Sequence, residues 1–176
     1  MAEINPYKPE KLICGFLYAD EADYEKAKIV MSGMYGDMDF ESSGIKFSHT
    51  SYYETEMGGP LTRRFVSFKD TVDPSRLSEV KLFAMETESE LLFEGTQNRR
   101  VNIDPGLLSE PKVVLASAKN FSHRIAIGHG IWAELTLRYI GNTYTTLEWT
   151  YPDYAFAESV RIFNNIRENY RRQLDK

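Results

Sequence analysis

Residue types able to carry out acid–base chemistry gather between positions 102 and 153. Histidine titrates near neutral pH, and a partly buried carboxylate can have its pKa moved toward that range. His123 lies in this stretch together with Glu134 and Asp104, and Arg124 could orient the group that transfers a proton. We therefore predict His123, Glu134 and Asp104 as candidate catalytic residues.

Groups suited to an anionic ligand occur in the same stretch and on an earlier segment. Arginine makes bidentate contacts with oxyanions, and an aromatic ring can stack on a flat, nucleotide-like ligand. Several convergent polar groups on rigid strands are typical of a binding site. The candidate ligand-binding residues are Arg64, Arg124, Arg138, Tyr53 and Trp149.

A purely structural role is the alternative for many of these residues. Asp104-Pro105-Gly106 has the composition of a tight turn, and Asp153 could cap a final helix. Arg124 and Glu134 could form a cross-strand ion pair, and the tyrosines could be core or interface aromatics. The sequence leaves both interpretations open.

Neither a metal site nor a covalent nucleophile has a specific motif. His123 and Glu134, with Asp104 or His129, have donor types that suit a divalent metal, but no His-Glu-x-x-His or paired-cysteine spacing occurs. We therefore predict no metal ligands and leave the cofactor unknown. Cys14, the single cysteine, lies in an apolar run and is expected to be a small buried hydrophobic residue.

The elements that must position these residues begin with a ferredoxin-like split βαβ unit. Asp20 can cap a first helix that Gly36 ends, and Asp73-Pro74 can start a second. A tyrosine-rich loop near residues 49–60 could act as a lid or as a partner-binding surface. Apolar runs and period-two alternation predict strands at residues 11–18, 38–47, 63–68 and 99–103.

The second half of the chain is expected to extend this unit. Residues 109–118 are predicted as a helix, although Val113-Val114-Leu115 could equally form a strand. A helix of about twenty residues should follow Pro152. The predicted fold is α+β, one domain over residues 1–176, with a split βαβ half at 10–104 and a helix, a three-strand antiparallel meander and a C-terminal helix at 105–176.

Alternation of apolar residues predicts the register of two hairpins. Three-residue turns at 128–130 and 141–143 keep the apolar side chains on one face. The first turn sets Arg124 opposite Glu134 and places His123 on the other, apolar face. The second aligns Leu147 with Leu137.

Composition predicts a folded cytoplasmic protein. Of 176 residues, 42% are hydrophobic and 13% aromatic, which is enough to offset the entropy of ordering. No apolar run approaches the roughly 18 residues needed to cross a bilayer, so we expect no membrane partner. The N-terminus lacks the basic and apolar regions of a signal peptide, and one cysteine fits a reducing compartment.

The net charge of −5 is unevenly distributed. Residues 1–104 hold 12 Lys and Arg against 19 Asp and Glu, whereas residues 105–176 hold 9 against 7. An acidic first half disfavours nucleic acid, because phosphate backbones need a cationic surface. The second half can still accommodate a small anionic ligand.

Two strands resemble the signature strands of RNA-recognition-motif domains. They are Leu12–Leu17 and Arg63–Phe68, and that family stacks bases on exposed aromatic residues. Here Ile13 occupies the stacking position of the first strand, and the glycine-aromatic start of the second signature is absent. Core packing of Phe65 and Phe68 is therefore the preferred interpretation.

A second resemblance covers nearly the whole chain. The motifs that carry it are Tyr52–Gly58, Arg63–Phe65, Asn102–Gly106, Ser122–Ile125, Ala133–Thr136 and Trp149–Tyr154. Together they resemble an uncharacterised prokaryotic family of domains of unknown function, some of whose members are labelled "GTP-binding protein", and the resemblance implies no activity. The chain has no Gly-x-x-x-x-Gly-Lys-Ser/Thr, so the phosphate cradle of a P-loop is absent.

The sequence thus predicts a small-molecule-binding domain for an anionic or nucleotide-like ligand, with non-redox catalysis as an option. The alternative is an interaction or scaffolding module without a ligand, in which the aromatic loop at 52–57 and a hairpin tip form a homodimer or partner interface. A pocket that touches His123, Arg124 or Glu134 favours the first.

Overall fold

The first half of the chain folds in the expected ferredoxin-like order. In the computed structural model, which describes residues 3–175, the sheet begins β2-β4-β1-β5 with all neighbouring strands antiparallel. The elements are β1 (Glu10–Tyr18), α1 (Glu21–Tyr35), β2 (Met38–Glu41), β3 (Ile45–Phe47), α2 (Glu54–Met57), β4 (Leu61–Val72), a 3-10 turn (Pro74–Arg76), α3 (Leu77–Glu90) and β5 (Val101–Leu108).

Local capping chemistry explains where α1 begins and where the 3-10 turn that leads into α3 begins. The Asp20 carboxylate accepts a hydrogen bond from the Ala22 amide at 2.9 Å, and Asp73 accepts one from the Ser75 amide at 2.8 Å. Each bond satisfies an amide that has no partner within its helix. Both predicted helix starts are therefore confirmed.

The second half continues the same sheet. Its order runs on as β5-β6-β8-β7, and β9 pairs with β8. The protein therefore has an α+β fold in which one antiparallel sheet joins both halves. The elements are β6 (Lys112–Ser117), β7 (Arg124–Gly128), β8 (Ile131–Ile140), β9 (Thr143–Thr146), α4 (Pro152–Ala155) and α5 (Ala157–Leu174).

Asp104-Pro105-Gly106 does not form the predicted turn, because β5 runs straight through it. Asp104 pairs with Gly15 of β1. A Cβ added at Gly106 would lie 2.6 Å from the Val114 carbonyl oxygen, so glycine is needed where β5 and β6 approach closely. This close contact accounts for Gly106, the residue that most suggested a turn.

The helix predicted at residues 109–118 is also wrong, and its strand alternative is confirmed as β6. Ser109 and Lys112 are joined by backbone hydrogen bonds, so Glu110 and Pro111 form the turn between β5 and β6. The β-branched pair Val113-Val114 favours the strand once a partner lies on each side.

The hairpin predictions are confirmed in part. Arg124 pairs with Glu134 as expected, but a bulge near Gly128 shortens the turn to His129-Gly130. Thr143 pairs with Ile140, so the second turn is also two residues long and Leu137 faces Thr146 rather than Leu147. Positive φ angles at all four turn residues, Gly141 and Asn142 included, are typical of such tight hairpins.

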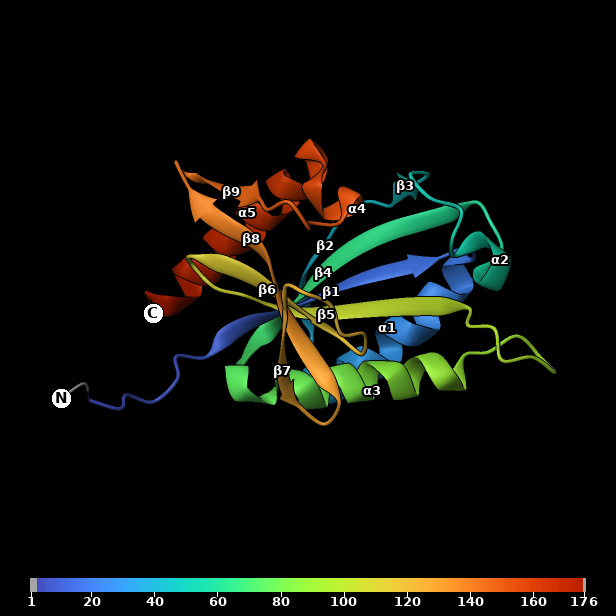
Figure 1. The fold of residues 1–176 in the computed structure, drawn as a ribbon, viewed down its shortest axis with the longest axis horizontal. Coiled ribbons are helices and arrows are strands. Elements are labelled where there is room, and N and C mark those ends of the chain that lie inside the picture. Colours follow the sequence, from blue (N-terminus) through green and yellow to red (C-terminus); the bar gives the residue numbers. More distant parts are fainter. Residues whose placement is uncertain (1–2, 176) are drawn as a thin grey trace.

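The sheet separates two hydrophobic cores, with α1 and α3 on one face and α4 and α5 on the other (Figure 1). Alternation along β4 sends Phe68 to the first core and Phe65 to the second, and both are buried. Their burial confirms the core-packing interpretation. Within residues 3–175, no helix has both the length and the apolar composition to span a membrane.

Replacing Gly106 with alanine should destabilise the protein by about 1–3 kcal/mol, because the new methyl group meets backbone that cannot easily move. Gly33 of α1 is the matched control, since an added Cβ there has nothing within 4 Å. Gly33→Ala should stabilise by about 0.4–1 kcal/mol. Urea unfolding of both variants measures the difference, and equal midpoints would contradict the close β5–β6 contact.

Candidate functional site

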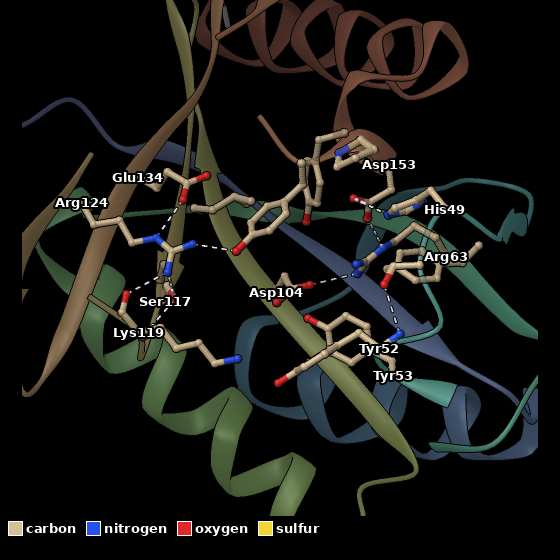
Figure 2. Close-up of a pocket in the computed structure, with 17 residues that line it drawn as sticks. His49, Tyr52, Tyr53, Arg63, Asp104, Ser117, Lys119, Arg124, Glu134 and Asp153 are labelled. Carbon is tan, nitrogen blue, oxygen red and sulfur yellow. Dashed lines mark hydrogen bonds and ion pairs between the residues drawn. The ribbon is translucent and has the colours of Figure 1, made fainter. Parts of the chain in front are cut away.

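A cavity of about 480 Å³ lies on the face of the sheet that carries α4 and α5. Its floor comes from β4, β5 and β6, and its walls come from residues 47–53 and 151–154 (Figure 2). Aromatic side chains from both walls, including Tyr52, Tyr53 and Tyr151, face buried charges on the floor. Its volume suits a small organic ligand.

Arg63 organises one end of the cavity (Figure 2). Its Nη1 lies 3.0 Å from Asp104 Oδ2, and its Nε lies 2.7 Å from Asp153 Oδ2. His49 Nε2 approaches the other oxygen of Asp153 to 3.8 Å. Arg63 is only 4% exposed, so one buried guanidinium joins β4, β5 and α4.

Arg63 and Asp104 hold each other in their ionised forms. Burial alone would raise the pKa of Asp104, but Arg63, Lys81 and a hydrogen bond from Asn102 bring that pKa below its usual range. Burial would lower the pKa of Arg63, whereas Asp153 and Asp104 raise it. Asp104 is therefore a carboxylate at neutral pH, and it can accept a hydrogen bond from a ligand.

Arg124 organises the opposite end through all three of its nitrogens. Nε donates to Glu134 Oε2 at 2.8 Å, and Nη2 donates to the Tyr151 hydroxyl at 2.6 Å. Nη1 donates to Ser117 Oγ at 3.1 Å and to the Lys119 carbonyl oxygen at 2.8 Å. The predicted Arg124–Glu134 ion pair is therefore confirmed, and Arg124 also binds two further segments, residues 117–119 and Tyr151.

His123 contacts Glu134, which corrects the prediction that they lie on opposite faces. His123 Nε2 lies 2.9 Å from Glu134 Oε2. His123 precedes the first paired residue of β7, so the alternation of a strand does not govern its direction. Its ring stacks on Trp149 at 5.0 Å in a cleft beside the main cavity, and Trp149 Nε1 donates to the Leu135 carbonyl oxygen.

Two of the predicted arginines lie away from the cavity. Arg64 points to the opposite face of the sheet, where it pairs with Glu21 and Glu41 and lies 4.6 Å from the Tyr24 ring centroid. Arg138 is exposed on β8 and lines none of the cavities described above. The structure thus brings together Tyr53, Asp104, Arg124 and Glu134 from the predicted set.

Three residues of the cavity were not predicted from the sequence, namely Arg63, His49 and Lys119, and Asp153 is not the helix cap that was expected. Asp153 lies inside α4 and its carboxylate faces Arg63. Period-two alternation does place Arg63 on one face with Phe65, but it cannot say which face carries the cavity. His49 and Lys119 lie in connecting segments, where no periodic signal exists.

The loop that forms one wall is anchored to the sheet by Arg99. Arg99 Nε and Nη2 bind the two oxygens of Glu56 in α2 at 2.6 and 2.9 Å. Arg99 Nη1 also donates to Glu88 and Asn102, and Asn102 donates to Asp104 Oδ2 at 2.9 Å. This network holds Tyr53 over the cavity, where burial and Asp104 raise the Tyr53 pKa to about 12.

The donor set does not define a metal centre. Within residues 3–175, no group of three or more His, Cys, Asp or Glu side chains is placed to hold a metal ion. The arrangement can instead bind a polar molecule, from which the Asp104 carboxylate can accept hydrogen bonds.

The fold and the cavity define an α+β protein with a ferredoxin-like sheet and a charged, aromatic-walled pocket. Residues 8–170 match the model of the family described as "Domain of unknown function (DUF4416)". The chain belongs to this family, which confirms the resemblance to an uncharacterised domain family. No curated protein and no solved structure matches the chain.

Replacing Arg63 with glutamine should destabilise the protein by about 3–5 kcal/mol near pH 7, because the buried Asp153 and the partly buried Asp104 lose their cation. The stabilising ionisation of Asp104 is present above the ordinary aspartate pKa of about 3.9 and is lost as pH falls through the lower folded value. The deficit measured by urea unfolding should therefore shrink at about pH 3.

Arg76 provides the control, since it is exposed and pairs with the exposed Glu79. Arg76→Gln should leave the unfolding midpoint unchanged at both pH values. A loss in Arg63→Gln that is equal at both pH values would show that Arg63 acts by packing alone.

Proposed function

We propose that the cavity binds a small anionic organic ligand, and that this binding is the function of the protein in the cytoplasm. The observation that carries the proposal is the placement of buried ion pairs along an open, aromatic-walled cavity. Buried ion pairs are seldom needed for stability, because apolar side chains of similar volume serve equally well. Charges kept at such a position are better explained by a ligand.

Lys119 supports an anionic ligand. The cavity also contains Arg63 and Arg124, but carboxylates neutralise both of these arginines. Lys119 forms no ion pair within residues 3–175, and its Nζ lies 5.4 Å from the centroid of the Tyr52 ring. Figure 2 shows the Lys119 side chain extending into the opening from the side opposite His49. The uncompensated positive charge at the mouth therefore favours an anion.

The aromatic walls support a ligand with a flat part. Tyr52 is 65% exposed and Tyr151 45% exposed, so these rings present free faces that the fold itself does not cover. Stacking on an exposed aromatic face suits any planar ring. A ligand with a ring and an anionic group, such as a nucleotide, matches both features.

Isothermal titration calorimetry with inorganic phosphate, ribose 5-phosphate and nucleoside 5′-monophosphates tests this proposal. At least one probe should bind with a Kd below about 1 mM, the weak end of the range for specific ligands. Lys119→Ala should weaken that binding about tenfold, since a charge-assisted contact is lost. Raising the salt concentration should weaken the wild type more than the variant.

Lys46 is the matched control, because it is an exposed lysine next to Phe47 whose side chain points to the other face of β3. Lys46→Ala should bind like the wild type. If every probe fails to bind, or if Lys119→Ala binds as tightly as the wild type, the protein does not bind anions here. The interaction module without a ligand then becomes the preferred function.

A further inference from the structure

A second, smaller chamber opens from the cavity where the sheet divides between β5 and β6. The pairing of these two strands ends at Gly106 and Leu115, and residues 101–105 of β5 have no partner in β6. The chamber has a volume of about 150 Å³ and lies beside this unpaired part of β5, where Asn102 and Asp104 line it. A water molecule occupies about 30 Å³ in the liquid, so the chamber can hold a group of several heavy atoms.

Side chains of α3 replace the missing strand along this part of β5. The Ile103 amide donates to Glu88 Oε1 at 2.6 Å, and Lys81 Nζ donates to the Ile103 carbonyl oxygen at 2.7 Å. Alternate residues of a strand direct their backbone groups to the same side, so Pro105 lacks its N–H on the side of β6, where the pairing ends. Glu88 and Lys81 are both buried, so the gap between the strands is a fixed feature of the fold.

The chamber and the main cavity share part of their lining. Tyr53, Asp104, Ser117 and Lys119 line both spaces. In Figure 2, Asp104 lies between Ser117 on one side and Tyr53 on the other. An anion bound at Lys119 therefore lies next to the chamber, and the same ligand can extend into it.

Asp104 offers the chamber a hydrogen-bond acceptor. Both hydrogen bonds to this carboxylate in the described chain end at Oδ2, one from Arg63 and one from Asn102. Its side chain is 26% exposed, and Oδ1 is not among the buried atoms that lack a partner. Oδ1 is therefore accessible and free to accept a hydrogen bond from a ligand.

Tyr53 and Ser117 offer hydrogen-bond donors. The Tyr53 hydroxyl forms no hydrogen bond within residues 3–175, but it is accessible, whereas the Tyr154 hydroxyl is buried. Ser117 Oγ accepts from Arg124 Nη1 and from the Lys119 amide, both at 3.1 Å, and its own proton has no acceptor in the described part of the chain. Each hydroxyl can therefore donate to a ligand.

The ionised groups around the chamber restrict what it can bind. Glu88 Oε2 lies 2.9 Å from Arg99 Nη1, and Asp104 is paired with Arg63. An anion in the chamber would approach two carboxylates whose arginines are already neutralised, and an ammonium group would meet the two hydroxyl protons. An apolar group would leave polar atoms without partners, which costs free energy. A hydroxyl both donates and accepts, so adjacent hydroxyls match one acceptor and two donors.

We propose that the chamber binds adjacent hydroxyl groups of a sugar, so that the ligand of this protein is a sugar that carries a phosphate. Asp104 Oδ1 accepts from one hydroxyl, and Tyr53 and Ser117 donate to the hydroxyl oxygens. This inference rests on the proposed function and names the class of its ligand. The phosphate lies at Lys119, which borders both spaces.

Calorimetry that compares inorganic phosphate with ribose 5-phosphate and the nucleoside 5′-monophosphates tests the chamber. The tightest-binding sugar phosphate or nucleotide should bind about tenfold more tightly than inorganic phosphate, because its hydroxyls form additional hydrogen bonds. Either the 2-deoxy or the 3-deoxy form of that probe should bind about tenfold more weakly than the parent, since it leaves groups of the chamber without partners.

Variants locate the contact through the ratio of the deoxy Kd to the parent Kd. Tyr53→Phe keeps the ring and removes a hydroxyl that has no partner in the described fold, and it should lower the ratio from about ten to about two. Ser117→Ala should lower it similarly. Tyr52→Phe is the matched control, because this neighbouring tyrosine lines the main cavity but not the chamber, and the ratio should stay at about ten.

The outcomes distinguish the two proposals. Deoxy forms that both bind as tightly as the parent, or a ratio unchanged in both Tyr53→Phe and Ser117→Ala, would overturn the chamber and leave the anion site standing. Lys119→Ala should weaken the parent and deoxy forms alike. If it weakens neither while Tyr53→Phe still lowers the ratio, the chamber is supported and the anion site is overturned. Failure of every probe would overturn both.

Discussion

The buried guanidinium of Arg63 is the interaction on which the rest of the site depends. It lies between Asp104 of β5 and Asp153 of α4, so a strand in the middle of the sheet and the C-terminal helical segment meet at one charge. An isolated charge in this position would be very unfavourable, which means that the three residues must be present together. Their mutual neutralisation sets the floor of the cavity and limits where a ligand anion can bind.

The cavity walls are held by two other arginines that act in a similar way. Arg124 fixes Tyr151 and the residues after β6, while Arg99 fixes α2 and with it the tyrosine loop. Each guanidinium has enough donors to join several segments at once. The hydrogen bonds of Arg124 and Arg99 therefore hold the two aromatic walls in place, although the Tyr52 and Tyr151 side chains remain exposed to solvent.

Local rules accounted for many of the elements of the fold. Asp20 and Asp73 cap helices as their types predict, and alternation correctly placed Arg124 opposite Glu134. These features depend on neighbouring residues or on a single hairpin. The segment 104–118 was predicted wrongly because its local sequence is compatible with two structures. Asp104–Gly106 could form a turn or a strand, and Val113–Leu115 could form a helix or a strand. Pairing of β5 with β6, which brings Gly106 against Val114, selects between them.

The sequence by itself determined the α+β class, the split βαβ order and the concentration of candidate site residues in the second half of the chain. Only the tertiary structure decided that Arg63 rather than Arg64 lines the cavity, and that His49, Lys119 and Tyr154 belong to it. Period-two alternation distinguishes the two faces of a strand but does not say which face α4 and α5 will cover. That choice depends on contacts between residues far apart in the chain, such as Gly15 with Tyr154, which no local pattern contains.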